Sequence, residues 1–263
     1  MTMQPSGFQQ QSARHRLDVY LAEHKLVTSR SQAESWVRMG KVTVNGVVVK
    51  KPGFAIHDGD TVKLLAEEQY VSRAALKLKS ADQQFKIDFR GKIMLDVGSS
   101  TGGFTEYALR HGAEKVIAVD VGTDQLHPSL RTDGRIELHE KTDIRDVVLA
   151  GRQGNTRQVV LTDIVNIVVC DVSFISLREI LPHVAKIAPA ATVIAMVKPQ
   201  FEARHSNITH KGVIKNDTMR RKVLKDFEMW VQKLYKIVDK HDSDVAGAKG
   251  NVERFYRLHT LGK

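Results

Sequence analysis

The sequence has very little cysteine, since Cys170 is the single one among 263 residues. A lone cysteine cannot close an internal disulfide, which is typical of proteins that fold in the reducing cytoplasm. The eleven histidines are scattered, without the Cys-x-x-Cys or His-Glu-x-x-His spacings that bind zinc. We therefore expect a cytoplasmic protein with no disulfide framework and no metal site.

Long hydrophobic runs are also missing. The longest apolar stretches, Ile164–Cys170 and Ala190–Val197, are well short of the roughly 20 residues that a membrane-spanning helix needs. Residues 1–13 are polar and rich in glutamine, and they lack the basic and apolar segments of a secretory signal. We predict a disordered tail over 1–13 and no stable association with a membrane.

The sequence is also short of acidic residues. It has 30 Asp and Glu against 40 Lys and Arg, which gives a formal charge of +10. Such an excess of positive charge favours polyanionic partners, and without a membrane segment the better candidate is nucleic acid. A hydrophobic content of 42% is ordinary for a globular protein. The length suits two domains, one small and one of moderate size.

Two short helices open the predicted small domain, which spans residues 14–65. The first is expected at Arg16–His24. Thr28 or Ser29 is a candidate N-cap for the second helix, Arg30–Met39, which Gly40 would end. On this second helix three apolar residues at i, i+3 and i+4 should face the core, and these are Ala33, Trp36 and Val37.

A β-hairpin should follow the two helices. β-Branched residues alternate on both sides of Asn45–Gly46, which is the strongest short-range signal for a hairpin. A further strand is expected at Thr61–Leu65, after a turn at residues 58–60. Residues 66–70 would then form a short linker to a second domain.

The small domain resembles the alpha-L RNA-binding fold, which a small-subunit ribosomal protein and many pseudouridine synthases share. The matching stretch, RLDVYLAEHKLVTSRSQAESWVRMGKVTVNGVVVKKPGFAIHDGD, covers nearly the whole domain. In that family the start of the second helix and the hairpin contact structured RNA. The resemblance therefore implies an RNA-binding surface made of Arg16, Ser29, Arg30, Arg38, Lys41, Lys50 and Lys51.

A second domain is expected over residues 71–263. From Gly91 onward it alternates between apolar strands and helices, which predicts a Rossmann-like α/β fold with a parallel, doubly wound sheet. With the small α+β domain before it, this defines the expected fold class. The first strands are expected at Lys92–Val97, Val116–Val119, Ile167–Asp171 and Thr192–Lys198. Helices are expected at Phe104–His111, Ser176–Ile187 and Thr218–Leu234, and two last strands near Tyr235–His241 and Glu253–His259.

A glycine-containing loop at residues 96–103 follows the first strand. Glycines there let the backbone approach a ligand at the carboxyl ends of the strands. Asp120, which ends the second strand, suits the two hydroxyls of a ribose, and Asp96 suits an ammonium group. The spacing differs from the Gly-x-Gly-x-x-Gly dinucleotide motif, and an acidic residue would repel a pyrophosphate. S-adenosylmethionine, which has a cationic head, a ribose and no phosphate, therefore fits better than NAD.

The candidate cofactor residues surround this loop and the ends of the following strands. Asp143 is the weaker member, as a partner for the adenine amino group, because it could equally cap a helix. The full set is Asp96, Gly98, Ser99, Ser100, Thr101, Gly102, Gly103, Asp120, Val121, Asp143, Ile144 and Asp171.

A second resemblance is specific. YVSRAALKL resembles the first helix of FtsJ-type 2′-O-methyltransferases, and further matching stretches are MLDVGSSTGGFTEYAL, VVCDVSFISL, AMVKPQFE and GNVERFYRLH. With the N-terminal domain included, the chain resembles the TlyA family of ribosomal RNA methyltransferases, often labelled hemolysin A, over residues 14–260. FtsJ-type enzymes carry a Lys-Asp-Lys-Glu catalytic set, and the resemblance assigns it to Lys77, Asp171, Lys198 and Glu253.

This resemblance implies methylation of a ribose 2′-hydroxyl, that of a cytidine, in ribosomal RNA or assembled ribosomal subunits, with S-adenosylmethionine as methyl donor. Lys198 is the candidate general base, although it could instead only orient the hydroxyl. Asp171 would orient Lys198, while Lys77 and Glu253 would position the hydroxyl. Asp171 and Lys198 each end a predicted strand, where the active sites of α/β proteins lie.

Several alternatives stay open. The chain could be a non-catalytic RNA-binding assembly factor, a membrane-active hemolysin, or a methyltransferase that acts on a base. Cys170 is expected to pack in the core rather than act as a nucleophile. Phe174 could stack on a base, cap the cofactor cavity or simply pack. A basic loop could contact RNA or be a solvated connection, and its members are Arg204, His205, His210 and Lys211.

Overall fold

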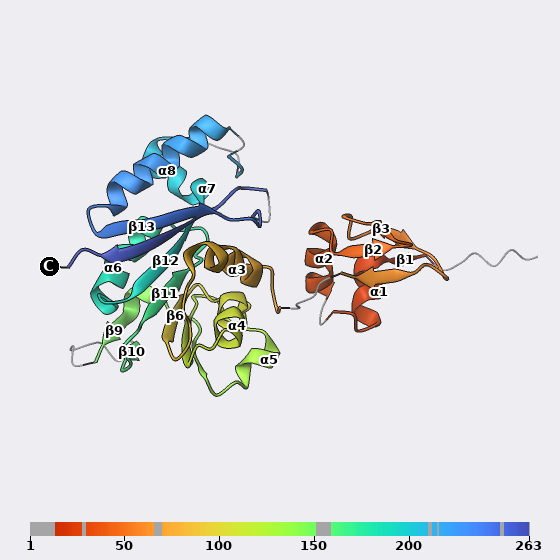
Figure 1. The fold of residues 1–263 in the computed structure, drawn as a ribbon, viewed down its shortest axis with the longest axis horizontal. Coiled ribbons are helices and arrows are strands. Elements are labelled where there is room, and N and C mark those ends of the chain that lie inside the picture. The colour runs from red at the N-terminus through yellow and green to blue at the C-terminus, as the bar shows by residue number, and fades with distance from the viewer. Residues whose placement is uncertain are drawn as a thin grey trace, which may run out of the picture. The chain divides into compact units, whose positions relative to one another are not determined.

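A computed structural model describes residues 14–27, 30–65, 70–150, 159–209, 212–214, 216–247 and 250–262. They form two compact units, of which the second begins at Tyr70 (Figure 1). The predicted tail, the N-cap candidates Thr28 and Ser29, and most of the predicted linker lie outside the described residues. Tyr70, the last residue of that predicted linker, is buried in the core of the second unit.

The first unit combines two helices with short antiparallel strands. The helices are α1 (Leu17–Glu23) and α2 (Arg30–Arg38). A three-stranded sheet has the order β3 (Val47–Val48), β2 (Val42–Val44), β5 (Val62–Leu64). A separate pair joins β1 (His15–Arg16) to β4 (Ala55–Ile56).

The local signals of this unit are confirmed with one correction. The three apolar residues of α2 are buried, and Gly40 follows the helix with a positive φ of 70°. Asn45 and Gly46 form the hairpin turn with φ values of 51° and 80°, as the Asn-Gly pair predicted. Arg16, predicted as the first residue of a helix, instead lies in β1 and pairs with Ala55, so α1 begins at Leu17.

The second unit is built on a seven-stranded sheet, which confirms the predicted α/β fold class. The five strands in the middle and at one edge run parallel, whereas β14 is antiparallel to both of its neighbours. Their order is β13 (Tyr235–Asp242), β14 (Arg254–Thr260), β12 (Thr192–Val197), β11 (Ile167–Cys170), β6 (Ile93–Val97), β7 (Lys115–Val119), β8 (Ile136–His139).

Helices cover both faces of this sheet (Figure 1). One face packs against α3 (Ala74–Phe85) and α4 (Gly103–Arg110), and the other against α6 (Leu177–Ile187) and α8 (Asp217–Val231). Alternate residues of a strand point to opposite faces. In β12 this sends Ile194 and Met196 toward α3 and α4, and the intervening residues toward α6 and α8. Burial on both faces explains why β11 is apolar throughout and β12 is apolar after Thr192.

Short elements complete the unit. They are α5 (Pro128–Arg131), α7 (Pro199–Glu202), the 3₁₀ turns η1 (Ile144–Asp146) and η2 (Ala203–Ser206), and a parallel pair of β9 (Val147–Leu149) with β10 (Val159–Leu161).

The differences from expectation fall at element ends and sheet edges. The helix predicted within residues 70–78 begins only at Ala74 and continues to Phe85, because Tyr70 packs as part of the core ahead of it. The helix expected to reach Leu234 ends at Val231. The sequence did not predict β8, an edge strand whose residues are all half-buried and therefore lack a clear pattern. Cys170 is fully buried in the core, which confirms its predicted packing role.

Gly103 offers a test of how closely α4 packs on the start of α3. A Cβ atom there would overlap Ser72 Oγ and lie 2.8 Å from Ala74 Cβ. Because such overpacking destabilises cores, we expect Gly103→Ala to lower the free energy of unfolding by about 1–3 kcal/mol. Urea unfolding would measure this as a lower midpoint at an unchanged slope. Gly134→Ala is the matched control, since nothing lies within 4 Å of its Cβ position. Equal midpoints for the two variants would contradict the prediction.

Candidate active site

The predicted catalytic residues converge at one edge of the sheet. Asp171 directly follows β11, and Lys198 directly follows β12, its parallel neighbour. Glu253 directly precedes β14, whose first residue pairs with the last residue of β12, so Glu253 lies at the same edge as Lys198. Lys77 comes from α3, which covers one face of the sheet. The fold thus brings together residues that are up to 176 positions apart.

These four residues form two ion pairs. Lys77 Nζ lies 2.5 Å from Glu253 Oε2, and Lys198 Nζ lies 2.5 Å from Asp171 Oδ1. Both lysines and Glu253 are buried. Lysine is rarely buried unless it is paired, and removing one partner of a buried pair costs about 3–5 kcal/mol. Each carboxylate therefore makes it possible for a lysine to lie at this depth.

A cavity of about 410 Å³ opens between the two pairs; we term it the acceptor cavity. Its wall includes Lys77, Lys198 and Glu253, together with Ser173 and Phe174. Gly247 also lines it, and a Cβ atom on Gly247 would lie 2.7 Å from Glu253 Oε1. The loop before β14 can therefore pass close to the Glu253 carboxylate because residue 247 is a glycine.

A second cavity, of about 370 Å³, lies beside it at the carboxyl ends of β6, β7 and β11. We term it the Asp120 cavity. Ser173 and Phe174 line both cavities, so the segment after Asp171 separates them. Of the predicted cofactor residues, those on its wall are Gly98, Ser100, Asp120, Val121, Asp143, Ile144 and Asp171.

Asp120 is held by the backbone on two sides. Its Oδ1 accepts a hydrogen bond from Gly122 N at 2.7 Å, and its Oδ2 accepts one from Ser100 N at 2.8 Å. A carboxylate can accept about four hydrogen bonds, so about two positions are left for donors in the cavity. Gly98 lies opposite with a φ of 83°, and a Cβ atom there would be 3.0 Å from the carbonyl oxygen of Asp171.

Five predicted cofactor residues do not line the Asp120 cavity. They are Asp96, Ser99, Thr101, Gly102 and Gly103. The glycines are needed for packing within the protein, because Cβ atoms at 102 and 103 would overlap the side chains of α5 and the start of α3. A direct contact of these five with a cofactor stays a prediction.

Asp96 is fully buried behind the cavity. Thr105 Oγ1 donates a hydrogen bond to its Oδ2 at 2.7 Å, whereas its Oδ1 receives none from the described residues. Burial raises the pKa of Asp96 to about 7, and the nearby carboxylates of Asp171 and Asp120 act in the same direction. A buried oxygen without a donor points to a further partner, such as a ligand or a water.

Asp143 caps a helical turn, one of the two roles left open by the sequence. Its side chain accepts a hydrogen bond from Arg145 N at the start of η1, and the Arg145 guanidinium contacts both carboxylate oxygens. The hydrogen bond from that guanidinium lowers the pKa of Asp143. Asp143 still lines the Asp120 cavity, but most of its acceptor positions are used inside the protein.

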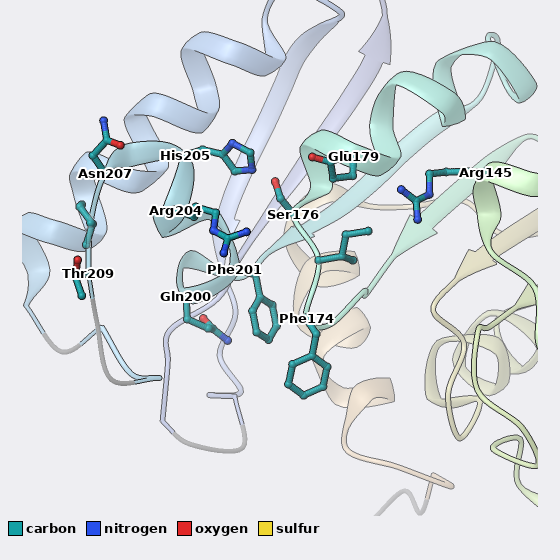
Figure 2. A pocket seen from close by; sticks show the side chains of 12 residues that line it. Arg145, Phe174, Ser176, Glu179, Gln200, Phe201, Arg204, His205, Asn207 and Thr209 are labelled. Carbon is teal, nitrogen blue, oxygen red and sulfur yellow. The ribbon is translucent and has the colours of Figure 1, made fainter.

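A third cavity, of about 1100 Å³, adjoins the other two and combines aromatic and basic side chains. Phe174 is 93% exposed with a φ of 66°, and its ring centroid lies 5.4 Å from that of Phe201. Figure 2 shows these two rings beside Gln200, with Arg204 and His205 above them. Simple packing therefore does not explain Phe174. The remaining basic-loop residues, His210 and Lys211, lie outside the described part of the chain.

In the first unit, the predicted RNA-binding residues lie on its surface, except Ser29, which is outside the described residues. Asp18 is fully buried and accepts hydrogen bonds from Arg16 Nε and Nη2 and from Arg30 Nε. Both arginine side chains stay more than half exposed. One buried carboxylate thus fixes two surface guanidinium groups, and exposed Lys41, Lys50 and Lys51 add further positive charge.

Sequence reasoning missed two polar residues that join the catalytic segments. Ser173 Oγ accepts a hydrogen bond from Lys198 Nζ at 2.7 Å. Buried Glu202 on α7 accepts hydrogen bonds from Ser176 Oγ at 2.6 Å and Leu177 N at 2.7 Å. It thereby ties the segment after Lys198 to the segment after Asp171. Both residues fall within the matching stretches, but neither their type nor their spacing indicates these contacts.

Two further features concern the described residues alone. No group of three or more His, Cys, Asp or Glu among them is arranged to hold a metal ion. No helix in this described part is long and apolar enough to cross a membrane.

Comparison with known proteins matches both units. Residues 70–259 match the FtsJ-like methyltransferase family, and residues 15–62 match the S4 domain. Hemolysin A of Brachyspira hyodysenteriae is 37% identical, and the match covers 94% of this chain and 99% of that protein. The 16S/23S rRNA (cytidine-2′-O)-methyltransferase TlyA of Mycobacterium tuberculosis is 36% identical, over 94% of this chain and 90% of that protein.

A solved structure of a hemolysin-type protein from Streptococcus thermophilus gives a TM-score of 0.68 at 36% identity. It covers 95% of this chain, and the match spans 90% of that structure. The arrangement of the site and these full-length similarities agree. The chain belongs to the FtsJ-like methyltransferase family, and within it to the group of TlyA and hemolysin A proteins.

Proposed function

We propose that this protein transfers a methyl group from S-adenosylmethionine to the 2′-hydroxyl of a cytidine ribose in ribosomal RNA. The observation that carries the proposal is that the Lys198–Asp171 pair joins the two cavities, because Asp171 lines the Asp120 cavity and Lys198 lines the acceptor cavity. The Lys77–Glu253 pair lies on the wall of the same acceptor cavity. Relatives named as rRNA (cytidine-2′-O)-methyltransferases, from Mycobacterium tuberculosis and Campylobacter jejuni, support the substrate. Because ribosomal RNA is the proposed substrate, we expect the protein to act in the cytoplasm.

The Asp120 cavity fits S-adenosylmethionine. The two free acceptor positions of Asp120 suit the cofactor's ribose hydroxyls, and apolar side chains such as Val121 and Ile144 suit its adenine. The unsatisfied oxygen of buried Asp96 suits the ammonium of the amino-acid part. When bound, the cofactor supplies an electrophilic methyl group on a sulfonium.

The residues of the acceptor cavity account for the second substrate. Lys77 and Glu253 can hold a ribose by hydrogen bonds to its hydroxyls, with the attacking oxygen close to Lys198 Nζ. Lys198, which is charged in its ion pair with Asp171, must first release a proton to solvent. Its unprotonated Nζ can then take the proton of the ribose hydroxyl as that oxygen receives the methyl group that the bound cofactor would supply. The positive charge then ends on Lys198 beside the Asp171 carboxylate.

RNA binding would involve both units. Exposed Phe174 offers a face on which a base can stack, and Arg204 and His205 lie along the adjoining cavity. Stacking on an aromatic ring combined with nearby positive charge is typical of single-stranded nucleic-acid sites. The arginines and lysines of the S4 unit would provide sequence-independent contacts to phosphates.

The alternatives leave observations unexplained. A non-catalytic assembly factor would not need two buried lysines, each paired with a carboxylate, on the wall of one cavity. A membrane-active hemolysin has no support from the composition of the described helices. Methylation of a base would give no role to Lys198.

Lys198→Ala tests the assignment of the base. With ribosomal subunits from a strain that lacks this gene and methyl-labelled S-adenosylmethionine, we expect label at a ribose 2′-oxygen. The variant should lose at least about 100-fold in rate, the range of general base catalysis. Lys186→Ala, an exposed lysine on α6, is the control that should stay active. Label on a base would refute ribose methylation, and RNA binding without transfer would favour the assembly factor.

Asp96→Asn tests the contact with the cofactor ammonium. The pKa of Asp96 near 7 means that this carboxyl is largely protonated at pH 6, and an ammonium partner would favour its charged form. Binding of S-adenosylmethionine should therefore release a proton at pH 6, and affinity should rise as the pH increases through 7. Calorimetry in buffers of different ionisation enthalpy measures the proton release. The same release from wild type and Asp96→Asn would exclude Asp96 as its source.

The RNA surface predicts a strong dependence on salt. Replacing Lys50 and Lys51 with alanine should lower affinity for the subunits and reduce the slope of log K against log salt by about two. A control variant replaces two exposed lysines of the other unit, Lys186 and Lys236. Filter binding from low to high salt measures both. Equal slopes for the wild type and the Lys50/Lys51 variant would rule out phosphate contacts at the hairpin.

A further inference from the structure

Ser173 makes a contact that none of the four expected catalytic residues provides. Lys198 Nζ donates a hydrogen bond to Ser173 Oγ at 2.7 Å. The Asp171 contact differs in kind, because Asp171 Oδ1 lies 2.5 Å from Nζ but receives no hydrogen bond of good geometry from the described residues. Asp171 therefore supplies charge, while Ser173 supplies the directed bond.

The geometry of an amine explains why direction matters. The Nζ of lysine is tetrahedral, and its charged form carries three N–H donors. In the neutral form one of these positions becomes the lone pair that accepts a proton. The hydrogen bond to Ser173 Oγ fixes the direction of one N–H group. The negative charge of Asp171, 2.5 Å from Nζ, favours a second N–H on its own side, and the third position is left over. This position is the one that must face the hydroxyl in the acceptor cavity, which Lys198 lines.

We propose that Ser173 is a positioning residue for methyl transfer, which orients the Lys198 lone pair toward the ribose hydroxyl. The inference rests on the proposed function, because it assigns a role within that same reaction. During transfer the O–H bond of the ribose breaks and a third N–H bond forms on Lys198. Ser173 Oγ accepts its N–H before and after this step, so Nζ need not move.

The location of Ser173 fits this role better than a packing role. Its side chain is exposed rather than part of the core, and it lines both the Asp120 cavity and the acceptor cavity. The next residue, Phe174, has a φ of 66°, an uncommon value outside glycine. Ser176, three residues after Ser173, donates a hydrogen bond from its Oγ to buried Glu202. The segment that carries the Ser173 hydroxyl is thus constrained by the backbone turn at Phe174 and by the hydrogen bond between Ser176 and Glu202.

Two variants separate the hydroxyl from the space that it fills. We expect Ser173→Ala to lower kcat by about 100-fold, the loss that a misplacement of about 1 Å can cause. The KM values for subunits and for S-adenosylmethionine should stay close to those of wild type. Ser173→Thr keeps the hydroxyl, and the exposed side chain leaves room for the added methyl, so most of kcat should return. Full activity of Ser173→Ala, or no recovery in Ser173→Thr, would overturn the proposal.

A second measurement tests the hydrogen bond without any methyl transfer. In protein labelled with ¹⁵N-lysine, the Lys198 ammonium signal can be assigned by its loss in Lys198→Arg. Its hydrogens should exchange slowly with water in wild type and Ser173→Thr, and rapidly in Ser173→Ala. Equal exchange in all three would refute the positioning role. If no methyl transfer occurs while the exchange rates differ as expected, the proposed function fails and the contact between Ser173 and Lys198 stands.

Discussion

The ion pair between Lys198 and Asp171 is the interaction on which the arrangement of the catalytic unit depends. The two residues follow adjacent parallel strands, so the sheet itself brings their charges to 2.5 Å. Neither charge could be held at this depth alone, because desolvation costs several kcal/mol per ion. The remaining polar groups of the site lie next to this pair. Ser173 accepts a hydrogen bond from Lys198, and the Lys77–Glu253 pair lines the same acceptor cavity as Lys198.

The rigidity of the sheet gives this pair a fixed position. Its central strands are buried on both faces between α3 and α4 on one side and α6 and α8 on the other. Interiors of this kind are packed as densely as organic crystals, so displacement of one strand is resisted by its neighbours. Close packing extends to the loops, where Gly98 meets the Asp171 backbone and Gly247 meets the Glu253 carboxylate. The first contact lies at the Asp120 cavity and the second at the acceptor cavity, so the walls of both cavities are closely packed.

The S4 unit uses the same physical device for a different purpose. Asp18 is buried and holds the guanidinium groups of Arg16 and Arg30, which remain on the surface. A fixed guanidinium loses less conformational entropy when it meets a phosphate than a free one does. In both units a carboxylate therefore sets the position of a cation that is proposed to face RNA or its ribose.

The sequence by itself determined the elements and the identities of the reacting groups. Apolar runs and turn residues define strands such as β11 and β12, and the matching stretches indicate Lys77, Asp171, Lys198 and Glu253, because both signals are local in the chain. Only the tertiary structure decided which groups touch. The Ser173–Lys198 bond, the isolation of Asp96 behind the cavity and the packing demand on Gly103 depend on distances between segments that no local pattern encodes.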